Sequence, residues 1–233
     1  MPDLSLPVMQ LLAIDTCGPT GSVALGRVSG QAVEILGQIE LEGRNYSATL
    51  VGAVGELLAR TGTQLGLLDA IVAVNGPGSF TGVRVGLAAV KGLAESTQIP
   101  VVAVSRLEVL AATDGTLFAA LDAHRHEVYL RSREPDGQMR ELLAGSHELA
   151  AIDPPPERIA LCDEAAVQLV SEVWPETELL RVAAPTAADA LRLCAPRVAA
   201  GEFVDLALLD GHYLRRSDAE IFGEPASTEP HTA

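Results

Sequence analysis

The sequence predicts an α/β protein whose chain passes twice through the same order of elements. Short apolar runs of strand length alternate with longer amphipathic stretches, several of which follow a Ser, Thr or Asp suited to a helix N-cap. The first half is expected to fold in the order β-β-β-α-β-α-β, and the second half starts this order again. The chain has 233 residues, of which 48% are hydrophobic and 3% aromatic. It can therefore fill such a core with Ala, Val, Leu and Ile.

In the first half, three strands come first and predict an antiparallel meander. Residues 15–22 have the chemistry of a hairpin turn between the first two. Ser47 is a plausible N-cap of the first helix, and a pattern starting near Thr81 predicts the second. The expected strands are Val8–Asp15, Ser22–Val28, Ala32–Leu41, Leu68–Val74 and Val101–Val104, and the expected helices are Ser47–Arg60, Thr81–Ser96 and a short one from Ser105 to Ala112.

The second half repeats the element order without repeating the residues. The expected strands are Leu117–Asp122, His126–Arg133, Met139–Leu143, Arg158–Cys162 and Leu179–Val182, with helices capped by Asp163 and Thr186. This order is that of a ribonuclease-H-like unit. We therefore expect two subdomains, 1–112 and 113–222, each a mixed five-stranded sheet with flanking helices. Residues 223–233 are polar and contain proline, and they predict a disordered tail.

Charge and composition exclude several classes of protein. The chain has 31 acidic and 16 basic residues and a net charge of −15, which disfavours stand-alone binding to nucleic acid or to an anionic membrane. No apolar run reaches the ~20 residues that span a bilayer, and no signal-peptide pattern is present. Three widely spaced cysteines suit a reducing compartment, so a cytoplasmic location is expected.

A glycine-rich turn, Asn75-Gly76-Pro77-Gly78, joins a buried strand to a helix N-terminus. Unpaired backbone N–H groups and the helix dipole suit this geometry to an anion or a nucleotide. Asp15, at the end of the first strand, could hold Mg²⁺ beside phosphates. The competing interpretations are a sharp turn and a turn-forming aspartate. A Walker loop is absent. We expect Asp15, Gly76 and Gly78 to form at most a vestigial site for ATP or ADP with Mg²⁺, with no cofactor required.

Other groups give weaker signals. His124 and His126 are two apart on a predicted strand and would share one face, but an ordinary polar turn is favoured because a zinc site needs three or four ligands. Ser79 and Ser105 have no evident His partner for nucleophilic catalysis. No catalytic residue and no metal site are therefore predicted.

The first two helices are apolar over more than one face. Small residues on the second helix predict close packing with another helix, and the surplus apolar surface favours a helix of a partner subunit. The alternative is packing onto the chain's own sheet. The predicted partner interface comprises Tyr46, Leu50, Ala53, Val54, Leu57, Gly82, Val83, Gly86, Ala89, Val90 and Leu93.

Several motifs together resemble the bacterial TsaB (YeaZ) family. The most specific is Gly76–Gly86, which reads Gly-Pro-Gly-Ser-Phe-Thr-Gly-Val-Arg-Val-Gly. The others are Leu12–Thr16, Gly21–Leu25, Leu121–Ala123 with Glu127–Tyr129, and Tyr213–Arg216. The resemblance covers nearly the whole chain.

This resemblance implies two actin-like subdomains and a role in forming N6-threonylcarbamoyladenosine at position 37 of tRNAs that read ANN codons. It implies a non-catalytic scaffold that pairs with the catalytic paralogue TsaD, is joined by the ATPase TsaE, forms a homodimer when alone and meets tRNA only through the complex. The paralogue holds its metal with a His-x-x-x-His helix, and the matching stretch Asn45–Leu50 has no histidine. Tyr46 stands where this family often has one. The alternative is an enzyme in its own right, a nucleotide-binding transferase or a metalloprotease-like protein.

Overall fold

The first five strands of the chain form one mixed sheet. The computed structural model describes residues 8–42, 45–134 and 136–215. The sheet has the order β3-β2-β1-β4-β5, in which β1 is antiparallel to β2 and parallel to β4. Its strands are β1 (Val8–Asp15), β2 (Thr20–Ser29), β3 (Ala32–Glu42), β4 (Ala70–Val74) and β5 (Val101–Val104). β1 and β4 are apolar along most or all of their length because both lie inside the sheet with both faces covered.

The second sheet has the same topology. Its order is β10-β9-β6-β7-β8, so β6 occupies the place of β1 and β9 that of β4. Its strands are β6 (Ala119–Asp122), β7 (Val128–Arg133), β8 (Met139–Ala144), β9 (Arg158–Leu161) and β10 (Glu178–Arg181). The repeat predicted from element order is thereby confirmed, as is the fold of two five-stranded α/β units.

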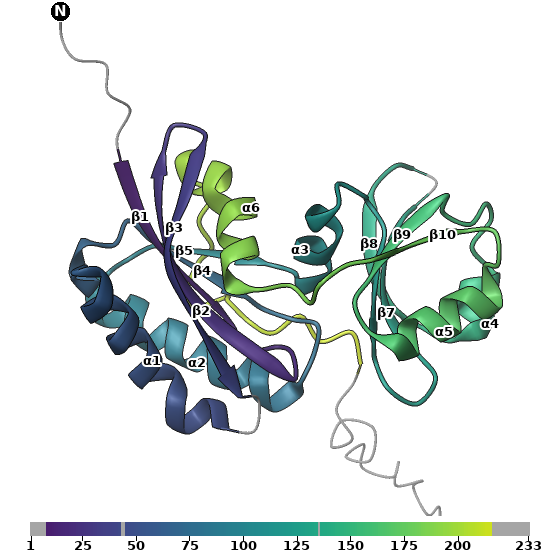
Figure 1. The fold of residues 1–233 in the computed structure, drawn as a ribbon, viewed down its shortest axis with the longest axis horizontal. Coiled ribbons are helices and arrows are strands. Elements are labelled where there is room, and N and C mark those ends of the chain that lie inside the picture. The colour runs from purple at the N-terminus through teal and green to yellow at the C-terminus, as the bar shows by residue number, and fades with distance from the viewer. Residues whose placement is uncertain (1–7, 43–44, 135, 216–233) are drawn as a thin grey trace, which may run out of the picture.

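Helices cover both faces of the first sheet (Figure 1). The helices α1 (Tyr46–Thr61) and α2 (Phe80–Thr97) lie side by side on one face, and α6 (Ala187–Ala199) packs on the other. Adjacent residues of β2 show this division: Gly21 faces Tyr46 of α1, whereas the Ser22 hydroxyl accepts a hydrogen bond from the first amide of α6. We call the first sheet with α1, α2 and α6 the first lobe.

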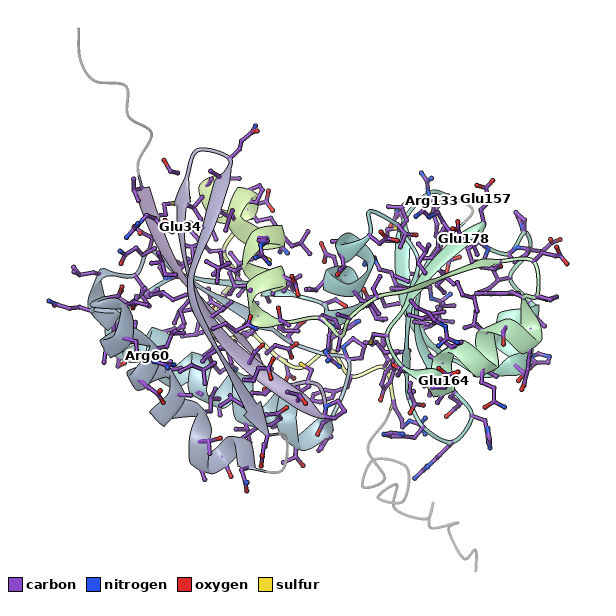
Figure 2. All side chains as sticks on the ribbon, viewed as in Figure 1. Glu34, Arg60, Arg133, Glu157, Glu164 and Glu178 are labelled. Atoms are coloured by element: carbon purple, nitrogen blue, oxygen red, sulfur yellow. The ribbon has the colours of Figure 1, made fainter. Side chains whose placement is uncertain are left out.

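The second lobe consists of the second sheet with α3 (Arg106–Thr113), α4 (Ser146–Ala150) and α5 (Glu164–Val173). A core of Leu107, Leu110, Leu121 and neighbouring residues lies where α3 packs on β6 and β9. Figure 2 labels charged side chains on both lobes, among them Glu34 and Glu164, whose side chains are 64% and 77% exposed. The acidic balance of the chain is therefore carried on its surface.

The chain is not divided into two uninterrupted halves. The prediction that 113–222 forms one subdomain is wrong for α6, whose apolar residues, including Leu191 and Val198, belong to the core of the first lobe. The reason is that the alanine-rich face of α6 fits closely against β2, where Gly26 leaves room for Leu191. The predicted boundary near residue 112 follows α3, whereas α3 packs on the sheet of the second lobe. The tail at 223–233 lies outside the described residues.

The sequence located most helix starts but missed others. Ser105, Asp163 and Thr186 are N-caps whose side chains accept backbone amide hydrogen bonds, as predicted. Ser47 is not a cap, because α1 begins at Tyr46 after Asn45, which makes no side-chain cap. α4 and a single 3₁₀ turn, η2 (Leu65–Leu67), were not predicted. No helix in residues 8–42, 45–134 and 136–215 is long and apolar enough to cross a membrane.

Candidate functional site

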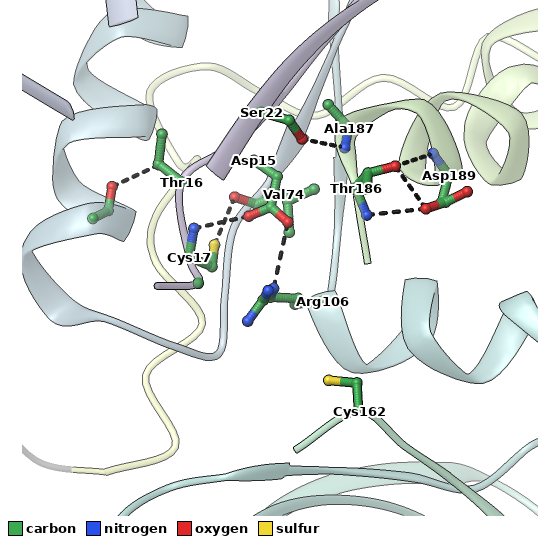
Figure 3. Close-up of polar contacts among 12 residues, drawn as sticks. Asp15, Thr16, Cys17, Ser22, Val74, Arg106, Cys162, Thr186, Ala187 and Asp189 are labelled. Atoms are coloured by element: carbon green, nitrogen blue, oxygen red, sulfur yellow. Dashed lines mark hydrogen bonds and ion pairs between the residues drawn. The ribbon is translucent and has the colours of Figure 1, made fainter. Parts of the chain in front are cut away.

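The candidate site lies at the carboxyl end of β1, between the two lobes. Asp15 is 1% exposed, and its carboxylate accepts a hydrogen bond from the Cys17 amide at 2.8 Å. Its other oxygen lies 3.4 Å from Nε of Arg106, which is 5% exposed (Figure 3). Both carboxylate oxygens are thus used by the chain itself. This arrangement does not fit a ligand that awaits Mg²⁺, because the cation beside Asp15 is already supplied by Arg106.

Arg106 is the functional-site residue that sequence reasoning missed. Burial works to lower the pKa of its guanidinium, but the adjacent Asp15 carboxylate together with Cys17 and Cys162 outweighs burial, so the pKa is raised. A Cβ on Gly18 would lie 2.3 Å from Nη2 of Arg106, so the glycine makes room for the guanidinium. The available signal was an arginine directly after the N-cap Ser105 at the end of a buried strand. An arginine at the first residue of α3 lies at the junction between the lobes, beside Asp15.

The glycine turn is packed tightly against the same region. Gly76 and Gly78 have φ angles of 114° and 158°, which favour glycine. A Cβ on Gly78 would lie 2.2 Å from the Cys17 carbonyl oxygen, and the Ser79 amide donates to that oxygen at 2.8 Å. The Gly76 carbonyl accepts from the Arg106 amide at 2.6 Å. This close packing favours the interpretation as a structural turn, and nucleotide binding at Gly76 and Gly78 stays a prediction.

Gly82 and Gly86 face inward, toward the turn that follows β1. A Cβ on Gly82 would lie 2.1 Å from the Thr16 carbonyl oxygen, and one on Gly86 would lie 2.2 Å from Thr16 Oγ1. The Thr16 hydroxyl also donates to the Gly82 carbonyl at 2.7 Å. The prediction that Gly82 and Gly86 form part of an interface with another subunit is therefore wrong. They let α2 approach its own lobe.

The predicted partner interface is mostly core. Every residue assigned to it except Ala89 and Leu93 is buried within the first lobe, because the apolar faces of α1 and α2 pack on the chain's own sheet. This corrects the interface prediction for Tyr46, Leu50, Ala53, Val54, Leu57, Gly82, Val83, Gly86 and Val90. The close packing predicted between α1 and α2 is present.

Tyr46, at the position where the resemblance expects a histidine, braces the junction. Its hydroxyl donates to the Gly18 carbonyl at 2.8 Å, and the side chain is buried. Burial, followed by the nearby Asp15 carboxylate, raises its pKa to about 12. Tyr46 therefore acts as a neutral hydrogen-bond donor that fixes the turn between β1 and β2.

The remaining candidate groups have structural roles. His124 and His126 both have positive φ, at 61° and 58°, so the prediction that they share a strand face is wrong and the polar-turn interpretation is confirmed. Ser79 and Ser105 are helix N-caps, and the Ser105 hydroxyl also donates to Glu141 at 2.6 Å. Within the described ranges, no group of three or more His, Cys, Asp or Glu residues could hold a metal ion.

The three cysteines are free and have raised pKa values. Burial is the main cause for each, and it brings the pKa of Cys162 to about 11 and that of Cys194 to about 12. The pKa of Cys17 is also raised well above its ordinary value, and its thiol donates to the Val74 carbonyl at 3.4 Å. Thiols that stay protonated at neutral pH are poor nucleophiles, so none of the three has the character of a reactive cysteine.

Solved structures match the chain along most of its length. One from Pseudomonas aeruginosa, described as an uncharacterized protein with similarity to peptidase YeaZ, is 32% identical with a TM-score of 0.66, and the match covers 89% of this chain and 100% of that one. The chain belongs to the TsaB/YeaZ family. A second structure, YeaZ from Pseudomonas aeruginosa, is 29% identical with a TM-score of 0.67, and that match covers 88% of this chain and 100% of the other.

Curated relatives agree with this assignment. The TsaB protein of Bacillus subtilis, named for tRNA threonylcarbamoyladenosine biosynthesis, is 40% identical over 52% of this chain and 53% of its own length. That of Escherichia coli is 35% identical over 55% and 56%. This chain thus spans about half the length of these curated relatives. Residues 35–147 also match the family model of TsaD, the tRNA N6-adenosine threonylcarbamoyltransferase.

Proposed function

We propose that this chain is a non-catalytic scaffold subunit in the formation of N6-threonylcarbamoyladenosine at position 37 of tRNAs that read ANN codons. In this proposal it pairs with a TsaD-like catalytic paralogue and helps to recruit a TsaE-like ATPase. The printed names of its TsaB relatives support the pathway, and the match of residues 35–147 to the TsaD model supports an evolutionary relation to the paralogue.

The observation that carries the non-catalytic role is the Asp15–Arg106 pair. A carboxylate at the end of the first strand is where a metal could be held beside phosphates, but here it is buried and neutralised by an arginine of the same chain. The group transfer then depends on ligands from the partner. The net charge of −15 also supports tRNA contact through the complex rather than through this chain alone.

We place the partner surface on the outward faces of α1 and α2. Val51 on α1 is 64% exposed, and Cβ atoms added at Gly52 and Gly55 would meet open space. Gly92 on α2 is equally open. An exposed valine among small residues allows the helices of another subunit to approach closely. The same face would serve a homodimer of the chain alone, so homodimer and heterodimer would compete.

The test is a Val51→Glu variant, with Ala165→Glu on the exposed start of α5 as the matched control. Each is mixed with the TsaD-like and TsaE-like proteins, tRNA, ATP and threonylcarbamoyl adenylate. Complex formation is measured by size exclusion with light scattering, and the modified nucleoside in tRNA by mass spectrometry. Burying an unpaired glutamate at an interface should weaken the complex at least about tenfold. Wild-type association and modification with Val51→Glu would contradict this interface.

Nucleotide binding is a separate part of the proposal. Because Asp15 is already paired, we propose that ATP or ADP with Mg²⁺ binds weakly and at the interface with the partner, not in the chain alone. Calorimetry of the chain alone and of the complex separates the two. Stoichiometric, tight binding of Mg²⁺–ATP to the isolated chain would instead favour an enzyme in its own right.

A further inference from the structure

A C-terminal segment connects the two lobes in addition to the two covalent links, which lie at Ser105, between β5 and α3, and at 182–186. We call residues 204–215 the strap. It leaves the end of α6, passes the glycine turn and reaches the second lobe, as the yellow ribbon in Figure 1 shows. Neither the sheet topology nor the site at Asp15 requires this path.

Backbone hydrogen bonds hold the strap to the first lobe. The Val204 amide donates to the Val101 carbonyl of β5 at 2.9 Å, and the His212 amide donates to the Asn75 carbonyl at 2.7 Å. Leu209 is 4% exposed and belongs to the core of the first lobe. A Cβ on Gly76 would lie 3.0 Å from the His212 carbonyl oxygen, so the strap packs directly on the glycine turn.

Side chains hold the strap to the second lobe. Nε2 of His212 lies 2.9 Å from Oε2 of Glu141, on β8. The Arg215 guanidinium donates to the Ala123 carbonyl at 2.9 Å and to the Glu127 carboxylate, both in the turn between β6 and β7. Leu214 is partly buried against the core at the lobe junction.

These two kinds of attachment differ in how easily they break. The side chains of His212, Arg215 and Glu127 are 37%, 23% and 32% exposed, so water can replace their mutual contacts. The backbone hydrogen bonds beside a buried leucine open only with local unfolding of the first lobe.

We propose that the strap is a releasable latch, which stays on the first lobe and fixes the angle of the second lobe through His212 and Arg215. When these side-chain contacts break, the second lobe turns about the covalent links at Ser105 and at 182–186. Glu141 is the receiving group. It is 7% exposed and is also held by Ser105 at 2.6 Å and by Arg131 at 2.8 Å. The latch thus links the angle between the lobes to the glycine turn, on which His212 packs, and to the start of α3, where Ser105 also holds Glu141.

The test measures the distance between the lobes in the full-length chain. Spin labels are placed at Glu56→Cys on α1 and Ser171→Cys on α5, both exposed, in a Cys162→Ala background, where the remaining Cys17 and Cys194 are buried. Double electron–electron resonance then measures the distance between the two labels in the latch variant His212→Ala/Arg215→Ala. The control variant is His147→Ala, which changes an exposed histidine away from the strap. We expect a broadened and shifted distance distribution for the latch variant and no change for the control.

A second variant keeps the proposal falsifiable if the double variant does not fold. Glu141→Gln preserves the size of the side chain and removes the charge that faces His212, so it should broaden the distribution less. In that variant, hydrogen exchange at the residue 212 amide should stay as slow as in the wild type, because the strap remains on the first lobe. An unchanged distance distribution in every variant that folds would overturn the latch, and so would loss of protection at residue 212.

Discussion

The two lobes end their equivalent central strands with the same residue and use it differently. Asp15 ends β1, and Asp122 ends β6. Each carboxylate accepts a hydrogen bond from the amide two residues later, from Cys17 at 2.8 Å and from His124 at 2.7 Å. The shared turn follows from local chemistry, because an aspartate at this position readily closes an Asx turn.

The partners of the two aspartates differ. Asp15 is buried with Arg106, whereas the Asp122 side chain is 25% exposed and pairs with a His124 side chain that is 87% exposed. One strand-end aspartate is part of the lobe junction, whereas its counterpart lies in a turn at the surface. The difference comes from long-range packing and not from the turn itself.

The largest effect is expected when the buried pair is broken. Arg106→Ala leaves the Asp15 carboxylate buried without its cation, which should lower the free energy of unfolding by about 3–5 kcal/mol. His124→Ala removes the exposed counterpart and should cost under about 1 kcal/mol. Urea unfolding followed by circular dichroism measures both. Similar decreases in the free energy of unfolding for the two variants would mean that the ion pairs of Asp15 and Asp122 contribute equally to stability.

A smaller effect is expected from the close contact between Gly82 of α2 and the turn at Thr16. Gly82→Ala pushes a Cβ against the Thr16 carbonyl oxygen and should cost about 1–3 kcal/mol. Gly92→Ala on the same helix meets nothing within 4 Å and should gain about 0.5–1 kcal/mol from helix propensity. Thermal melts of the two variants should therefore shift in opposite directions. If Gly82→Ala stabilises the protein, α2 does not depend on this close approach.

The corresponding contact in the second lobe is a carboxylate cap. Asp163 accepts from the Ala166 amide at the start of α5 and from the Asp122 amide at the end of β6, each at 3.1 Å. Asp163→Ala should cost about 1–2 kcal/mol, through loss of the cap and of the link to Asp122. Asp163→Asn, which retains one acceptor oxygen, is the matched variant and should recover part of the loss in denaturant titrations. Equal losses for Ala and Asn would assign the effect to charge.

The smallest effect is expected from pH at the contact between the lobes. Burial tends to raise the pKa of Glu141, but hydrogen bonds from His212, Ser105 and Arg131 outweigh it and hold the pKa below the ordinary value of 4.5. A carboxyl with a lowered folded pKa stabilises the protein fully above pH 4.5, and this stabilisation is lost as the pH falls through the lower folded value. Melting temperatures from pH 7 to pH 3 should therefore fall less steeply for Glu141→Gln. Parallel curves for the wild type and Glu141→Gln would show that Glu141 does not contribute to the loss of stability at low pH.

Much of the fold could be predicted because it depends on local patterns. Apolar runs marked the strands, and the caps at Ser105, Asp163 and Thr186 marked three helix starts. The Asp15–Arg106 pair could not be predicted, because its members are 91 residues apart and hydrophobic periodicity does not show which charges are buried. Spacing placed Gly82 and Gly86 on one face of α2, but it could not decide whether that face met another subunit or the Thr16 turn.

The position of α6 could not be predicted for a similar reason. Its small apolar residues suit either sheet, and only the fit of Leu191 at Gly26 selects the first. The earlier assignment of the apolar faces of α1 and α2 to a partner failed because their own sheet needs the same residues. In both cases the sequence predicts an apolar helix face but does not show which sheet or subunit packs against it.

The return of α6 has a consequence for synthesis of the chain. A ribosome makes β1 to β10 before it makes residues 187–199, so the first sheet leaves the exit tunnel before α6 can cover one of its faces. The second lobe is therefore an insertion within the first. Its strands are synthesised before α6, which the first lobe needs for completion. Translation pauses or truncations before residue 187 should leave a nascent chain with an uncovered apolar sheet, a form that binds chaperones.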